Sequence, residues 1–150
     1  MNAPRTRGPQ AQEDSPRADS EPAPSVPASL RQRMARAASD RIRQRKPDDP
    51  YRSLAREFPT LVHSCGLAQA LAFAQAKGGS HETYAQDLVT VLAAAGHEPV
   101  GSAEQLARRI REDLWVTQYI RVSRDALIAA VCLKQAIEAA DDEAAPGRGA

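Results

Sequence analysis

Alanine and leucine supply most of the apolar residues of this chain, and both are strong helix formers. Hydrophobic residues make up 42% of the sequence, but aromatic residues make up only 4%. Valine, isoleucine, tyrosine and phenylalanine, which favour pleated sheets, are comparatively sparse. A length of 150 residues leaves room for one folded domain and little more. The sequence therefore predicts a single-domain, all-α fold, a compact bundle of about five to seven helices.

Prolines, glycines and capping residues divide the chain into helical segments. A first helix is expected from the capping residue Ser29 to about Lys46, where Pro47 stops it. Tyr51 opens a second helix, which Pro59 is expected to break or kink. Residues 114–120 are ambiguous between helix and extended chain. Further helices are expected over residues 67–77, 80–95, 102–113 and 123–142, the last capped by Ser123.

The two ends differ in composition from the body. Residues 1–27 hold six of the eleven prolines and almost no large apolar side chains, so burial cannot offset the entropy of ordering them. We expect a disordered N-terminal tail over residues 1–27, a helical domain over 28–142 and a flexible C-terminal tail over 143–150. The N-terminus has no apolar core typical of a secretory signal, and the longest apolar run is eight residues, 126–133. We therefore expect a cytoplasmic protein without a membrane partner.

The most apolar segments predict the core. Leu67, Leu71 and Phe73 are expected to pack with Leu127 and Val131 of the last helix. This last helix is apolar nearly all round at its centre and should be the buried element of the bundle.

No pattern of catalytic or metal-binding residues is visible in the sequence. Cys65 and Cys132 lie in apolar, helix-forming stretches and suit buried free thiols in a reducing compartment. No histidine–cysteine pair has the spacing of a zinc site, since His63 and Cys65 point to opposite sides of a helix. Nothing local orients a base toward a nucleophile. We therefore expect no enzyme activity, no metal and no cofactor.

Basic residues are concentrated in one stretch of the chain. The net charge is only +1, but residues 28–46 carry seven basic groups against one acid, Asp40. Residues 47–150 carry ten basic groups against fourteen acids. A basic segment on a mildly acidic body can hold a polyanion on one face.

Two arginine pairs recur at the spacing of one helical turn. Arg41 and Arg45 are i, i+4 neighbours, as are Arg52 and Arg56, so each pair places two guanidinium groups on one helix face. Guanidinium matches the geometry of phosphate, which makes these residues candidate RNA-backbone contacts. The plainer alternative is a solvated face paired with nearby acids. The acids considered are Asp48, Asp49 and Glu57.

The central stretch resembles the small-subunit family of the type III-B CRISPR (Cmr) effector complex. A basic helix-forming segment over residues 51–62, with phenylalanine–proline at its end, precedes a glycine-opened, alanine- and leucine-rich helix from Gly66 to Lys77. The stretch from Tyr119 to Ala139 is similar to the closing helix of that family. The similarity covers roughly residues 28–142. Two positions depart from the family pattern: Cys65 stands where asparagine usually precedes the glycine, and Cys132 stands where tryptophan is common.

The resemblance implies a compact helical subunit without nuclease activity, acting in antiviral defence within a ribonucleoprotein complex. It implies other Cmr effector subunits as partners, above all the backbone subunit, together with neighbouring copies of itself and guide RNA paired to target RNA. By carry-over, Arg52, Arg56 and Lys77 lie within matching motifs, whereas Arg41 and Arg45 lie in a less strictly matched helix. Two other functions stay open: a free-standing helical nucleic-acid-binding regulator, and a helical scaffold that binds only protein.

Overall fold

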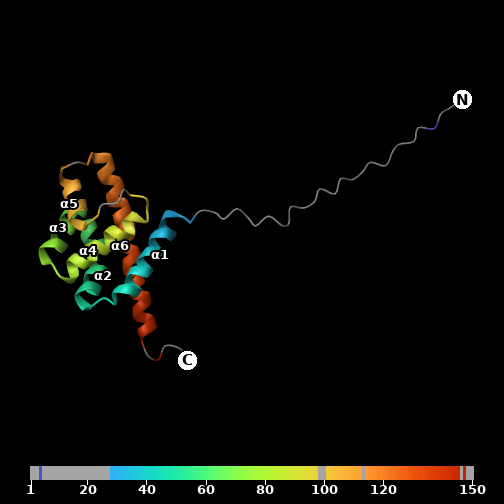
Figure 1. Ribbon diagram of the computed structural model, residues 1–150, viewed down its shortest axis with the longest axis horizontal. Helices are drawn as coiled ribbons and strands as arrows, with labels where there is room; N and C mark the ends of the chain where they lie inside the picture. Colours follow the sequence, from blue (N-terminus) through green and yellow to red (C-terminus); the bar gives the residue numbers. More distant parts are fainter. Residues whose placement is uncertain (1–3, 5–27, 98–100, 113, 146, 148–150) are drawn as a thin grey trace.

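The computed structural model describes residues 4, 28–97, 101–112, 114–145 and 147. Over these ranges the chain forms six helices and no strand, so the prediction of an all-α bundle is confirmed. The longest helix runs along one side of the bundle, against the first and second helices (Figure 1). The helices are α1 (Leu30–Arg45), α2 (Asp49–Cys65), α3 (Leu67–Lys77), α4 (Ser80–Ala93), α5 (Ala103–Glu112) and α6 (Val116–Ala144).

The predicted start of α1 at Ser29 is confirmed by a reciprocal cap. The Gln32 backbone N–H donates to Ser29 Oγ at 3.2 Å, and the Ser29 backbone N–H donates to Gln32 Oε1 at 2.8 Å. The two bonds satisfy backbone donors that a helix start leaves unpaired. The disordered tail expected over residues 1–27 falls, apart from Pro4, outside the described residues.

Pro59 does not break α2, which is one continuous helix of 17 residues. Pro59 lacks the N–H that would donate to the carbonyl of Ala55. The buried stripe of Leu54, Phe58 and Val62 continues on both sides of it. Packing of this stripe outweighs the lost bond, so the local breaker signal is overridden by tertiary structure.

Ser123 does not cap the last helix, because α6 already begins at Val116. The start is fixed instead by Gln118, whose side-chain oxygen accepts the backbone N–H of Trp115 at 3.3 Å. Leu114 and Trp115 are non-helical, so the ambiguous stretch divides between a short connection and the first turn of α6.

The core contains some, but not all, of the predicted side chains. Leu67 and Leu71 are fully buried, as expected, and α6 contributes a buried stripe that includes Leu133 and Ile137. The prediction for Phe73 is wrong: its side chain is 41% exposed, because the buried positions of α3 are 67, 70, 71 and 74 and Phe73 lies off that stripe.

Other predictions of burial are right only in part. Leu127 is half-buried against the core cluster, and Val131 is half-buried rather than enclosed. Cys132 is buried, and burial raises the pKa of its thiol. Cys65 is exposed, contrary to expectation, because it lies on the last turn of α2, where its Sγ donates to the carbonyl of Leu61 at 3.1 Å.

An aromatic cluster fills the centre between α2 and α4. The ring centroids of Tyr51 and Tyr84 lie 5.4 Å apart in an edge-on arrangement, and those of Phe58 and Tyr84 lie 5.0 Å apart. All three rings are almost completely buried. As far as the structure describes the chain, no helix combines the length and the apolar character that crossing a membrane requires.

Leu71→Ala should lower the free energy of unfolding by roughly 2–5 kcal/mol, because it opens a cavity at a fully buried position. Phe73→Ala, two residues along the same helix, is the matched control and should have a much smaller effect, since Phe73 is 41% exposed. Urea denaturation followed by circular dichroism measures both. Equal losses for the two variants would contradict the burial pattern of α3.

Candidate nucleic-acid interface

A buried carboxylate on α4 gathers the first predicted arginine pair. Arg41 donates to Asp87 Oδ1 from Nε at 3.1 Å and from Nη2 at 2.8 Å. Arg45 donates from Nε to both carboxylate oxygens, at 3.1 Å each, and from Nη2 to Oδ1 at 3.1 Å. The hydroxyl of Tyr51 donates to Oδ2 at 2.8 Å. Asp87 is thus bound from both α1 and α2.

Burial makes this cluster electrostatically strong. The side chain of Asp87 is 0% exposed, whereas those of Arg41 and Arg45 are 27% and 37% exposed. The hydrogen bond to Asp87 raises the pKa of Arg45. Burial, then the nearby Asp87 charge, raises the pKa of the Tyr51 hydroxyl, which therefore stays protonated and keeps donating at neutral pH. Two guanidinium groups and one carboxylate leave one net positive charge, at a site that solvent reaches from the arginine side.

The second arginine pair converges on a different acid. Arg52 Nε lies 3.5 Å from Asp141 Oδ1, and Arg56 Nη2 donates to Asp141 Oδ2, which joins α2 to the end of α6. Here the carboxylate is 30% exposed, and the two arginines are 36% and 48% exposed. This cluster also keeps one net positive charge, but water screens it far more than the Asp87 cluster.

The acids expected to pair with the arginines are only partly the ones that do so. Arg52 Nη1 lies 3.9 Å from Oδ1 of the fully solvated Asp49, as one alternative predicted. Asp48 instead caps α2: it accepts the backbone N–H of Tyr51 at 3.1 Å and the Ser80 hydroxyl at 2.6 Å, and the Ser80 bond lowers the pKa of its carboxyl.

Lys77 stands apart from both arginine clusters. Its Nζ lies 5.7 Å from the ring centroid of Phe73, a cation–π contact at the exposed end of α3. The ring of Phe73 in turn meets His81 edge-on, with centroids 6.0 Å apart. The five predicted residues therefore form three groups: Arg41 with Arg45, Arg52 with Arg56, and Lys77.

Arg36 and Arg43, which were not among the candidates, are exposed on α1. They are seven residues apart and lie opposite the buried stripe of Met34, Ala38 and Ile42. That spacing could have identified them from the sequence. The residues that the structure covers contain no group of three histidine, cysteine or acidic side chains placed to hold a metal ion.

Comparison with known proteins decides the family. Residues 30–140 match the family described as CRISPR-associated protein (Cas_Cmr5). The chain belongs to this family. The match spans α1 to α5 and most of α6, which confirms the resemblance found in the sequence to the Cmr small-subunit family.

Two relatives of this Cas_Cmr5 family chain come from Thermus thermophilus. One is named "CRISPR system Cmr subunit Cmr5"; it is 34% identical over 94 residues, which cover 62% of this chain and 76% of the relative. The other is a crystal structure titled as a CRISPR-associated Cmr5 family protein. It is 31% identical, with a TM-score of 0.65, and the match covers 75% of this chain and 96% of the other.

The two arginine clusters should differ sharply in their contribution to stability. Arg41→Met/Arg45→Met should lower the free energy of unfolding by roughly 3–5 kcal/mol, because it leaves Asp87 buried without a counter-ion. Arg52→Met/Arg56→Met should lower it by less than about 1 kcal/mol, because Asp141 is partly solvated.

Chemical denaturation of both double variants measures the difference. Adding Asp87→Asn to the first variant removes the stranded charge and should recover part of the loss. Equal losses in the two double variants, or no recovery with Asp87→Asn, would contradict the structural role given to the Asp87 cluster.

Proposed function

We propose that this chain is a non-catalytic structural subunit of a type III-B CRISPR (Cmr) RNA-targeting complex. Family membership carries the proposal: residues 30–140 match the Cas_Cmr5 family, and the relative at 34% identity is named as a Cmr subunit. Its partners are other Cmr subunits, above all the backbone subunit, and neighbouring copies of itself. In this role it stacks along the filament that holds the guide RNA, in the cytoplasm.

The basic residues contact the backbone of target RNA paired to guide RNA. Arg52, Arg56 and Lys77 are the main contacts, since all three are accessible and held only by weak, solvated interactions. A surface ion pair contributes about 0–1 kcal/mol, so a phosphate can displace Asp141 as the partner of these arginines. Contact through guanidinium and ammonium groups positions an RNA strand without selecting its sequence.

Arg41 and Arg45 take part through their residual charge. Their Nε and Nη2 atoms are bound to Asp87, and releasing them would leave a buried carboxylate unpaired. The bonds to Asp87 use the Nε and Nη2 side of each guanidinium, which leaves its Nη1 side directed away from that carboxylate. These two residues therefore add positive potential near the RNA rather than exchange partners with it.

A protein-only scaffold is the competing function, and one observation favours it. Both arginine pairs already have carboxylate partners within the chain, so neither pair needs RNA to satisfy its charge. A test therefore has to separate loss of RNA binding from loss of assembly.

The test is the affinity of the assembled complex for target RNA as a function of salt concentration. Arg52→Gln/Arg56→Gln should weaken binding and flatten the salt dependence, by about 0.7 in log–log slope for each phosphate of a single strand that is no longer neutralised. Asp141→Asn, the matched variant, frees both arginines from their acid and should strengthen binding.

Size-exclusion chromatography of each variant complex shows whether the chain has assembled. Normal assembly with unchanged affinity and slope would rule out these arginines as RNA contacts. Failure of the double variant to assemble would instead favour the scaffold function.

A further inference from the structure

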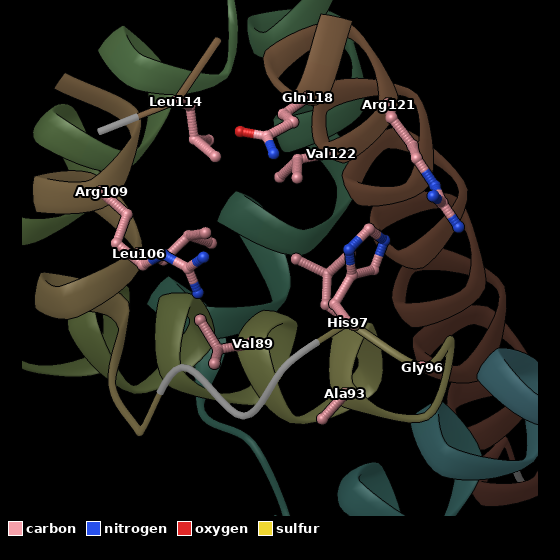
Figure 2. Close-up of a pocket in the computed structure, with 11 residues that line it drawn as sticks. Val89, Ala93, Gly96, His97, Leu106, Arg109, Leu114, Gln118, Arg121 and Val122 are labelled. Atoms are coloured by element: carbon pink, nitrogen blue, oxygen red, sulfur yellow. The ribbon is translucent and has the colours of Figure 1, made fainter. Parts of the chain in front are cut away.

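A cavity of about 260 Å³ opens between α4, α5 and the N-terminal part of α6 (Figure 2). It lies apart from the arginine clusters described above and from Lys77. Its walls are lined by Val89, Leu92, Ala93, Gly96, His97, Leu106, Arg109, Leu114, Gln118, Arg121 and Val122.

The cavity combines an apolar lining with a few polar groups. Val89, Leu106 and Val122 come from three different helices and enclose an apolar space. Arg109 and Gln118 extend toward that space from α5 and α6 (Figure 2). This is the usual composition of a binding site, in which apolar walls provide affinity and a few polar groups set orientation. At about 260 Å³ it is below the usual size for a small-molecule pocket and suits one large side chain.

Exposed apolar side chains adjoin the cavity where α5 leads into α6. Trp115 is 78% exposed, Val116 74% and Ile120 55%. Among the residues that the structure covers, Phe73 is the one other large apolar side chain with comparable exposure. Trp115 follows the cavity residue Leu114, and its backbone N–H is held by the side chain of Gln118, which also lines the cavity. We call these three side chains and the cavity the corner surface.

The charge of the corner surface indicates what could cover it. The cavity lining includes two arginines, Arg109 and Arg121, and no acidic residue. Its histidine, His97, already has an acidic partner, with Nε2 2.5 Å from Asp125 Oδ2. An occupant that brings carboxylates would complement the two arginines, whereas a basic one would be repelled.

Protein fits this surface better than the two other candidate occupants. RNA would offer phosphates to the arginines, but bases stack on aromatic rings, and here the one aromatic side chain has aliphatic neighbours, Val116 and Ile120. A second copy joined through the same surface would bring Arg109 and Arg121 of both chains together, which is unfavourable.

We propose that the corner surface is the docking site for an acidic segment of another protein. The segment places one large apolar side chain in the cavity, covers Trp115, Val116 and Ile120, and directs its carboxylates at Arg109 and Arg121. The proposed function enters only in taking this partner to be another subunit of the same complex.

Hydroxyl-radical footprinting with mass spectrometry tests the proposal, because Trp115 is the chain's single tryptophan and its oxidation can be followed in a mixture. The full chain is compared alone and in the complex assembled with guide RNA but without target RNA. Oxidation of Trp115 should fall severalfold on assembly and stay low after nuclease removes accessible RNA. Failure of the chain to assemble at all would refute the proposed function; assembly with Trp115 oxidised as in the isolated chain would refute the docking site alone.

Variants identify the chemistry of the occupant. Arg109→Glu and Ile120→Glu should each weaken incorporation into the complex by about tenfold or more, as expected for central interface residues. Arg36→Glu, which makes the same charge change at an exposed position of α1, should leave incorporation unchanged. An equal loss for Arg36→Glu, protection of Trp115 that nuclease abolishes, or concentration-dependent protection in the isolated chain would each overturn the proposal. The last two results would assign the surface to RNA or to a second copy.

Discussion

The buried carboxylate of Asp87 is the interaction on which the arrangement of α1, α2 and α4 depends. An ionised group removed from water is strongly unfavourable unless it is paired and hydrogen-bonded. Asp87 meets that condition only because Arg41 and Arg45 from α1 and Tyr51 from α2 reach it together. The requirement fixes the rotation of α1 about its axis, since both arginines must face α4.

This requirement divides the basic residues into two kinds. The α1 pair is held by a buried acid and belongs to the fold, whereas the α2 pair is held by the half-exposed Asp141 and can change partner at little cost. Both pairs have the same sequence spacing, so burial of the acid rather than spacing distinguishes them. The proposed RNA contact therefore rests mainly on α2 and on Lys77, and the corner surface provides a separate site for protein.

Local signals in the sequence predicted the helices well where backbone chemistry decides them. The bounds of α3 follow from Gly66 and Gly78, and the start of α1 follows from the capping residue Ser29. Prediction failed where packing or an unusual cap decides. Pro59 is accommodated within α2, and Gln118 rather than Ser123 sets the start of α6.

Side-chain partners were beyond the reach of sequence spacing. The i, i+4 rule found both arginine pairs, but their acids are 42 to 46 residues away in one cluster and 85 or more in the other. Three-dimensional packing alone brings such residues together. The exposure of Phe73 was, in contrast, readable from the stripe formed by Leu67, Ala70, Leu71 and Ala74, and the corner surface left no periodic signal at all.

Crosslinking to target RNA is the most direct test of the central claim. Target RNA carrying 4-thiouridine is bound to the assembled complex and irradiated, and crosslinked peptides of this chain are mapped by mass spectrometry. The account predicts crosslinks on the segments of α2 and α3 that hold Arg52, Arg56 and Lys77. A complex that contains this chain but yields no crosslink to it, or only crosslinks at Trp115 and its neighbours, would contradict the account.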